Sequence, residues 1–156
     1  MSVPMARYHH VEPILLVEDD PDLRDAVRLV LEDAGYDVVC TENGRDALAR
    51  LRESPVSLVL LDLMLPVMDG FEFRVQQMQD PQISSIPVIV FSCGSDIEEK
   101  VVPLRVSACL RKPIDVDALV ALIGALVRAG EPARQRPPGR RPVRGRGARR
   151  RSSGRA

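Results

Sequence analysis

Short apolar runs alternate with amphipathic stretches along most of the chain. The runs are nearly continuous in apolar residues, as expected of strands that are covered on both faces of a sheet. We expect strands over residues 14–17, 37–41, 57–61, 88–91 and 107–110. Parallel strands need helical crossovers, and an amphipathic stretch follows each run. The pattern therefore predicts an α/β fold, with a doubly wound, five-stranded parallel sheet and helices on both faces.

Capping and breaking residues mark the ends of the helices. Asp20 suits the N-cap of the first helix and Pro21 its first position, where a missing N–H costs nothing. The helix over 70–80 carries Phe71, Val75 and Met78 on one apolar face.

The helix expected over 97–105 and the last helix differ in how regular they are expected to be. Pro103 interrupts a weak helix over 97–105, whereas the last helix is capped by Asp115 and ends near Gly130. Its core stripe is expected to be Leu119, Leu122, Ile123 and Leu126, with Ala121 and Gly124 on the opposite side. A helix that is apolar nearly all round is usually covered on both sides, so this face is a candidate homodimer or partner surface.

The 156 residues divide into two parts of opposite charge. Residues 1–130 carry 12 basic and 21 acidic side chains, whereas residues 131–156 carry ten Arg and a single Glu. We expect a flexible N-terminal segment over 1–11, a domain over 12–130 and a disordered Arg/Pro-rich tail over 131–156. The arginines suit contact with an acidic partner or nucleic acid, although the tail lacks aromatics for base stacking.

Apolar run length and cysteine content bear on location. The longest apolar run, over 118–127, is far shorter than the roughly 20 residues that cross a bilayer, so no membrane association is expected. The three cysteines form no CxxC pair, which disfavours a metal cluster or a disulfide framework. A reducing cytoplasm fits this cysteine content best.

Polar side chains stand at the carboxyl ends of the expected strands, where open α/β sheets bind ligands. They are Glu18, Asp19, Asp62, Ser92 and, just after the fifth strand, Lys112. Each alone is explained by a cap, a turn or a surface charge, but together they indicate a site. Crowded carboxylates repel one another unless a cation joins them, and oxygen ligands suit Mg²⁺. Such a site keeps Asp62 ionised and nucleophilic, while the hydroxyl and the ammonium group can hold phosphoryl oxygens.

Four segments carry a resemblance to a known family: ILLVEDDPDLR from Ile14, LVLLDLMLPVMDG from Leu58, PVIVFS from Pro87, and the pair Lys112-Pro113. They resemble the receiver domain of bacterial two-component response regulators, over about residues 12–130. The resemblance implies a flavodoxin-like sheet with strand order 2-1-3-4-5. It also implies a single-domain protein, since the tail offers no folded output domain.

The resemblance implies a role for each residue of the pocket. Asp62 matches the phosphoacceptor, which takes a phosphoryl group from a sensor histidine kinase or a phosphotransfer protein. Glu18 and Asp19 match the acidic pair that holds Mg²⁺. Met64 matches the position whose backbone carbonyl completes the metal site.

The switch positions match only in part. Ser92 matches the hydroxyl that turns toward the phosphate, and Lys112 the lysine that pairs with it. Pro113 matches a proline that often follows in a cis peptide. Cys109, however, stands where the family usually has Tyr or Phe, and the segment between Ser92 and Lys112 is about two residues short. The surface that reports activation is therefore altered, while the phosphorylation pocket is intact.

The leading hypothesis is a phosphoacceptor, not an enzyme, that signals through partner docking or dimerisation. The alternative is a receiver-like adaptor that binds partners independently of phosphorylation, which the missing switch aromatic favours. A phosphohydrolase of the haloacid dehalogenase type needs an acidic residue where Met64 stands, so it is disfavoured. Met64 and Gly94 cannot orient a water molecule by hydrogen bonding, so slow self-dephosphorylation is expected.

Overall fold

A parallel sheet forms the centre of the computed structural model, which describes residues 12–92, 94 and 96–130. Its five strands lie in the order β2-β1-β3-β4-β5. They are β1 (Ile14–Val17), β2 (Val38–Thr41), β3 (Leu58–Asp62), β4 (Val88–Ser92) and β5 (Ala108–Arg111). The predicted fold and strand order are confirmed. The segments expected to be flexible and disordered, 1–11 and 131–156, lie outside the described residues.

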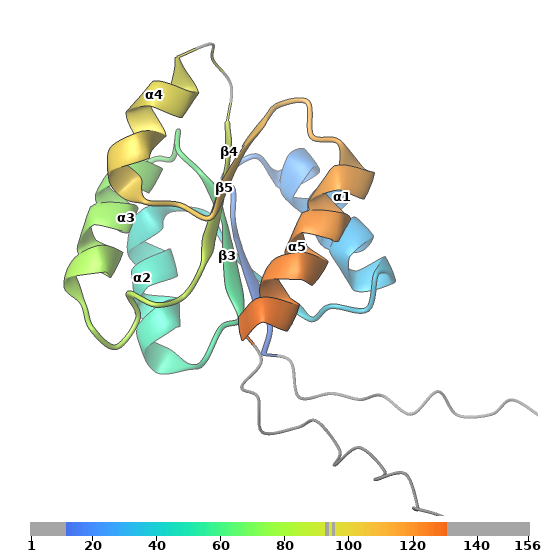
Figure 1. The fold of residues 1–156 in the computed structure, drawn as a ribbon, viewed down its shortest axis with the longest axis horizontal. Coiled ribbons are helices and arrows are strands. Elements are labelled where there is room, and N and C mark those ends of the chain that lie inside the picture. Colours follow the sequence, from blue (N-terminus) through green and yellow to red (C-terminus); the bar gives the residue numbers. More distant parts are fainter. Residues whose placement is uncertain (1–11, 93, 95, 131–156) are drawn as a thin grey trace, which may run out of the picture.

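Helices cover both faces of the sheet (Figure 1). Those described are α1 (Pro21–Asp33), α2 (Gly44–Glu53), α3 (Gly70–Gln79), α4 (Ile97–Val101) and α5 (Val116–Gly130), with a 3₁₀ helix η1 (Val102–Leu104) after α4. α1 and α5 lie on one face, and α2, α3 and α4 on the other (Figure 1). Because side chains alternate along a strand, β1 contributes Leu15 to the core under α2 and α3, and Ile14 to the core under α1 and α5.

The expected helix starts are confirmed at both ends of the domain. The Asp20 carboxylate accepts hydrogen bonds from the backbone N–H groups of Asp22 and Leu23, at 3.0 and 3.4 Å. The Asp115 carboxylate accepts one from the N–H of Ala118, at 3.1 Å. These bonds satisfy donors that the first turn of a helix leaves without an intrahelical partner.

The expected apolar face of α3 is wrong in part, since Phe71 packs on the core but Val75 does not. Val75 is 42% exposed, while the buried side of the helix carries Gly70, Phe73, Arg74 and Gln77. Arg74 and Gln77 are buried because they hydrogen-bond to backbone carbonyls of neighbouring segments. Counting apolar positions could not identify a core face that is half polar.

The weak helix over 97–105 is also shorter than expected. The α-helical part ends at Val101, and the tighter η1 turn carries Pro103 as far as Leu104. Arg105 then ends the segment with φ of 48°, in the left-handed region. Proline lacks the N–H that a continuing α-helix needs, which accounts for the change at this point.

The last helix packs as its pattern predicts, with Leu119 and Ile123 buried and Leu122 and Leu126 partly buried against the same core. Ala121 is exposed on the other side. Gly124 lies beside Tyr36, since a Cβ built on it would be 3.6 Å from the tyrosine hydroxyl. No helix in the described part of the chain is long and apolar enough to span a membrane.

Candidate functional site

Three carboxylates meet at the carboxyl ends of β1 and β3. One oxygen atom from each of Glu18, Asp19 and Asp62 lies within 4.8 Å of the others. The two strands are neighbours in the sheet, so residues that follow their last apolar positions are brought to the same place. Glu18 and Asp62 are 1% and 3% exposed, whereas Asp19 is exposed. The pocket is therefore acidic, buried on the sheet side and open to solvent through Asp19.

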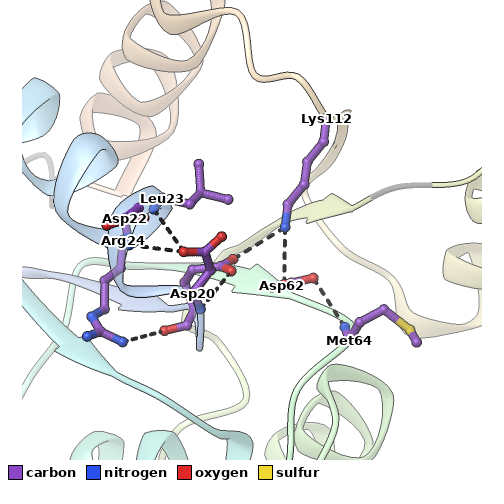
Figure 2. Close-up of polar contacts among 8 residues, drawn as sticks. Asp20, Asp22, Leu23, Arg24, Asp62, Met64 and Lys112 are labelled. Carbon is purple, nitrogen blue, oxygen red and sulfur yellow. Dashed lines mark hydrogen bonds and ion pairs between the residues drawn. The ribbon is translucent and has the colours of Figure 1, made fainter.

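Lys112 reaches into this pocket from the loop after β5 (Figure 2). Its Nζ lies 3.2 Å from Asp62 Oδ2 and 3.5 Å from Glu18 Oε2. Its backbone N–H donates to the Ser92 carbonyl at 3.0 Å, which ties the loop to the end of β4. The Lys112–Pro113 peptide bond is cis. One ammonium group thus contacts two of the three carboxylates.

Asp62 is held on both of its oxygen atoms. Oδ2 accepts from Lys112, and Oδ1 accepts from the backbone N–H of Met64 at 3.1 Å, while the Met64 side chain points away (Figure 2). The start of α3 closes the loop, because the Gly70 N–H donates to the Leu63 carbonyl at 2.9 Å. A Cβ on Gly70 would lie 2.5 Å from the Asp62 carbonyl oxygen. The loop after Asp62 can approach the helix this closely only with glycine at that position.

Glu18 is held by backbone and side-chain donors from α1 and its preceding loop. The Asp20 N–H donates to Glu18 Oε1 at 3.2 Å, and Arg24 Nη1 donates to the Glu18 carbonyl at 3.1 Å. Burial, followed by the charge and hydrogen bond of Asp62, raises the pKa of Glu18 to about 7. Lys112 and the Asp20 N–H oppose this rise but do not cancel it. Burial and the Asp62 carboxylate together therefore outweigh the effect of Lys112 on Glu18.

The pKa of Lys112 is raised in turn. Burial lowers it, but the charges and hydrogen bonds of Asp62 and Glu18 together outweigh burial. Ser92, at the end of β4, is fully buried, and its hydroxyl is among the described side-chain groups with no hydrogen-bond partner. A buried hydroxyl without an acceptor carries a free-energy cost, so Ser92 is able to gain from a new acceptor nearby.

Cys109 lies on β5 opposite Val90 of β4. It is partly buried and packs on the core under α2, α3 and α4. Burial and the charge of Glu98 raise the pKa of its thiol, against the effect of Arg111. Arg111 also forms an ion pair with Glu98 at 3.2 Å, which ties β5 to α4.

The structure brings together the side chains of Glu18, Asp19, Asp62 and Lys112, with Ser92 at the adjacent strand end. Met64 contacts Asp62 through its N–H, and the expected role of its carbonyl stays a prediction. Arg24 also holds the Glu18 backbone, but in sequence an arginine on an amphipathic helix resembles any solvated surface charge, so it was not predicted. Its spacing of six residues after Glu18 was the available signal.

The fold and this pocket define a receiver domain of two-component signalling. Residues 14–124 match the sequence model of the response regulator receiver domain, so the chain belongs to the response regulator receiver family. Protein PilH from Pseudomonas aeruginosa is 34% identical over 116 residues, covering 73% of this chain and 96% of PilH. The DNA-binding dual master transcriptional regulator RpaA from Synechocystis is 36% identical over 117 residues, covering 74% of this chain. The match covers 48% of RpaA, so the chain spans about half the length of that relative.

Solved structures agree with the family assignment. The signal receiver domain of a signal transduction histidine kinase from Syntrophus aciditrophicus has a TM-score of 0.71 and 28% identity, covering 78% of this chain and 93% of that one. The receiver domain of sensor histidine kinase PA1611 from P. aeruginosa, with a magnesium ion coordinated in its active site cleft, has a TM-score of 0.70. It is 23% identical, covers 76% of this chain and 98% of its own, and shares the fold. Family membership favours a phosphoacceptor over the adaptor alternative.

Proposed function

We propose that a sensor histidine kinase or a phosphotransfer protein phosphorylates this chain on Asp62, in the presence of Mg²⁺. The observation that carries the proposal is the buried Asp62 carboxylate, 3.2 Å from the Lys112 ammonium and within a cluster of three carboxylates. An oxygen nucleophile, an acidic cation site and a cationic group that can hold a phosphate are the parts that phosphoryl transfer to aspartate needs.

The donor set of the pocket fits Mg²⁺. Glu18, Asp19, Asp62 and the Met64 carbonyl would supply only oxygen atoms, which a small hard cation prefers. The raised pKa of Glu18 reflects burial and carboxylate repulsion, and a divalent cation would relieve the repulsion. Bound Mg²⁺ would neutralise negative charge that develops on the transferred group. The similarly folded PA1611 receiver domain is known with magnesium in its cleft.

The chemistry of Asp62 follows from its surroundings. A carboxylate oxygen attacks the phosphorus of a phosphohistidine, an O–P bond forms, and the P–N bond breaks with its electron pair returning to the imidazole nitrogen. The Lys112 ammonium, now paired with Asp62 and Glu18, can hold the phosphoryl oxygens. The buried Ser92 hydroxyl can donate to another of them, which would satisfy its free donor.

Intact-mass spectrometry after treatment with acetyl phosphate and Mg²⁺ tests this function. We expect one added phosphoryl group, which is lost in Asp62→Ala and when Mg²⁺ is omitted. Asp37→Ala is the matched control, because it removes an exposed carboxylate outside the pocket. If the wild-type chain stays unmodified while another receiver domain is modified alongside it, the adaptor alternative takes precedence.

The output is proposed to be partner docking or homodimerisation in a reducing cytoplasm, with slow self-dephosphorylation and no catalytic turnover of a substrate. The exposed side of α5 around Ala121 is the proposed dimer surface. Ala121→Arg should then weaken self-association in analytical ultracentrifugation. A monomer at high concentration, both with and without phosphorylation, would contradict the dimer. Residues 131–156 are proposed to contact an acidic partner or nucleic acid through their ten arginines.

A further inference from the structure

Arg74 of α3 is a buried arginine outside the acidic pocket, with 6% of the residue exposed. Its guanidinium donates three hydrogen bonds, all to uncharged oxygen atoms. Nε donates to the Leu104 carbonyl at 2.8 Å, Nη2 to the Arg105 carbonyl at 2.9 Å and Nη1 to Gln77 Oε1 at 2.8 Å. A single side chain of α3 therefore binds the end of the segment formed by α4 and η1.

These hydrogen bonds matter because burying a cation costs free energy unless its donors are satisfied. Burial lowers the pKa of Arg74, as expected of a guanidinium without a compensating carboxylate among these three partners. Gln77 is fully buried and orients one edge of the guanidinium. Its own Nε2 donates to the Ile83 and Ile86 carbonyls at 3.0 and 3.1 Å. The guanidinium position is thus fixed from the α3 side.

The segment that Arg74 holds has little helical structure of its own. α4 has only five residues, and η1 contains Pro103. The last carbonyls of a helix lack intrahelical donors, and Arg74 supplies donors to the Leu104 and Arg105 carbonyls. The end of this segment is therefore fixed by α3, beside the residue with positive φ.

This segment connects the two switch residues. Ser92 ends β4 before α4 begins, and Lys112 follows β5, which starts three residues after Arg105. The first residue of α3, Gly70, comes directly after the loop that follows Asp62. Arg74 thus links the helix that follows the phosphoacceptor loop to the connection between Ser92 and Lys112.

We propose that Arg74 is a positioning residue of the switch, whose guanidinium fixes the end of the α4–η1 segment against α3 and so sets the geometry of the connection between Ser92 and Lys112. The roles of Ser92 and Lys112 rest on the proposed function. The anchoring of the segment does not, because it is a property of the unphosphorylated chain.

Amide hydrogen exchange of the full, unphosphorylated chain tests the anchor. The Arg105 N–H donates to the Val102 carbonyl at 3.3 Å and the Ser107 N–H to the Val88 carbonyl at 2.8 Å, so both report on the segment. In Arg74→Met we expect exchange at these amides to rise at least about tenfold more than at Ile14, which is in the far part of the sheet. An equal rise at all three amides would show a merely structural residue and overturn the proposal.

Gln76→Met is the matched control, since it also replaces a polar side chain of α3 with methionine but leaves all three hydrogen bonds of Arg74 in place. We expect its effect on the Arg105 and Ser107 amides to be less than a third of that of Arg74→Met, and an equal effect would overturn the anchor. If Arg74→Met does not fold, Arg74→Lys replaces it, because an ammonium cannot reproduce the planar fork. We then expect about a threefold local rise, and no local rise would overturn the proposal.

Phosphorylation by acetyl phosphate provides the second measurement. Glu18 and Asp19 follow β1 and Asp62 ends β3, so none of them lies in the segment that Arg74 holds. Arg74→Met should therefore leave the half-saturating Mg²⁺ concentration within about twofold. The maximal rate should fall at least about threefold, since Ser92 and Lys112 are less well placed. An unchanged maximal rate would overturn the link to the switch. Absence of phosphorylation in the wild-type chain would instead refute the proposed function and leave the exchange result to decide the anchor.

Discussion

Gly70→Ala is a sharp test of how closely α3 supports the loop that follows Asp62. The added Cβ would lie 2.5 Å from the Asp62 carbonyl oxygen, 2.7 Å from Leu63 Cα and 3.0 Å from Leu63 Cδ2. Cβ atoms essentially never approach other heavy atoms below 3.0 Å, so the gap must open by at least about 0.5 Å. The two closest neighbours are backbone atoms, and no side-chain rotation can relieve the contact.

The size of the effect follows from these contacts. Forcing an extra methyl group into a packed region costs about 1–3 kcal/mol. Alanine recovers up to about 1 kcal/mol relative to glycine in a helix, and less at the first helical position. We expect a net loss of about 2 kcal/mol in the free energy of unfolding, or a fall of roughly 6–10 °C in Tm. Because Asp62 itself must move, its phosphorylation rate should fall about tenfold or more.

Gly124→Ala is the control for this substitution. A Cβ there meets the Arg128 guanidinium and the Tyr36 hydroxyl at 3.6 Å, an ordinary contact distance. The change should stabilise α5 by about 0.5–1 kcal/mol and leave phosphorylation unchanged. Urea unfolding and the initial rate of acetyl phosphate labelling measure both properties. Equal stabilities for the two variants, together with labelling rates within twofold, would refute this account of Gly70.

Three other predictions concern charge, lifetime and the tail. Burial and Asp62 raise the pKa of Glu18 from 4.5 to about 7, so in this pH range the folded chain binds more protons than the unfolded chain. Without Mg²⁺, the free energy of unfolding should therefore fall as pH rises through this range. In urea unfolding, Glu18→Gln should not show that fall and should be more stable than the wild-type chain at pH 8. A parallel fall in both proteins would contradict this prediction. Met64→Asn should speed phosphate loss from Asp62, measured by intact mass over time, because an amide can orient water where an exposed methionine cannot. Ending the chain at Gly130 should leave Tm and Asp62 labelling unchanged and abolish any salt-sensitive binding to DNA, and a large loss of Tm would show that the tail is structural.

Much of the fold was predictable because its signals are local. Residues close in sequence determine the apolar runs of β1 and β4 and the core stripe of α5. They also determine the helix caps at Asp20 and Asp115. The carboxyl-end placement of Glu18, Asp19 and Asp62 follows once the strands are parallel, since parallel strands end at the same edge.

Tertiary structure alone decided the features that join distant segments. Arg74 and Gln77 form half of the core face of α3, because carbonyls some 30 residues away in Leu104 and Arg105 accept from Arg74. The closeness of Gly70 to Asp62 and the raised pKa of Glu18 likewise depend on how loops from different strands come together. Periodicity reports which residues share a face. It does not report which polar groups find partners there, and hydrogen bonding and desolvation depend on those partners.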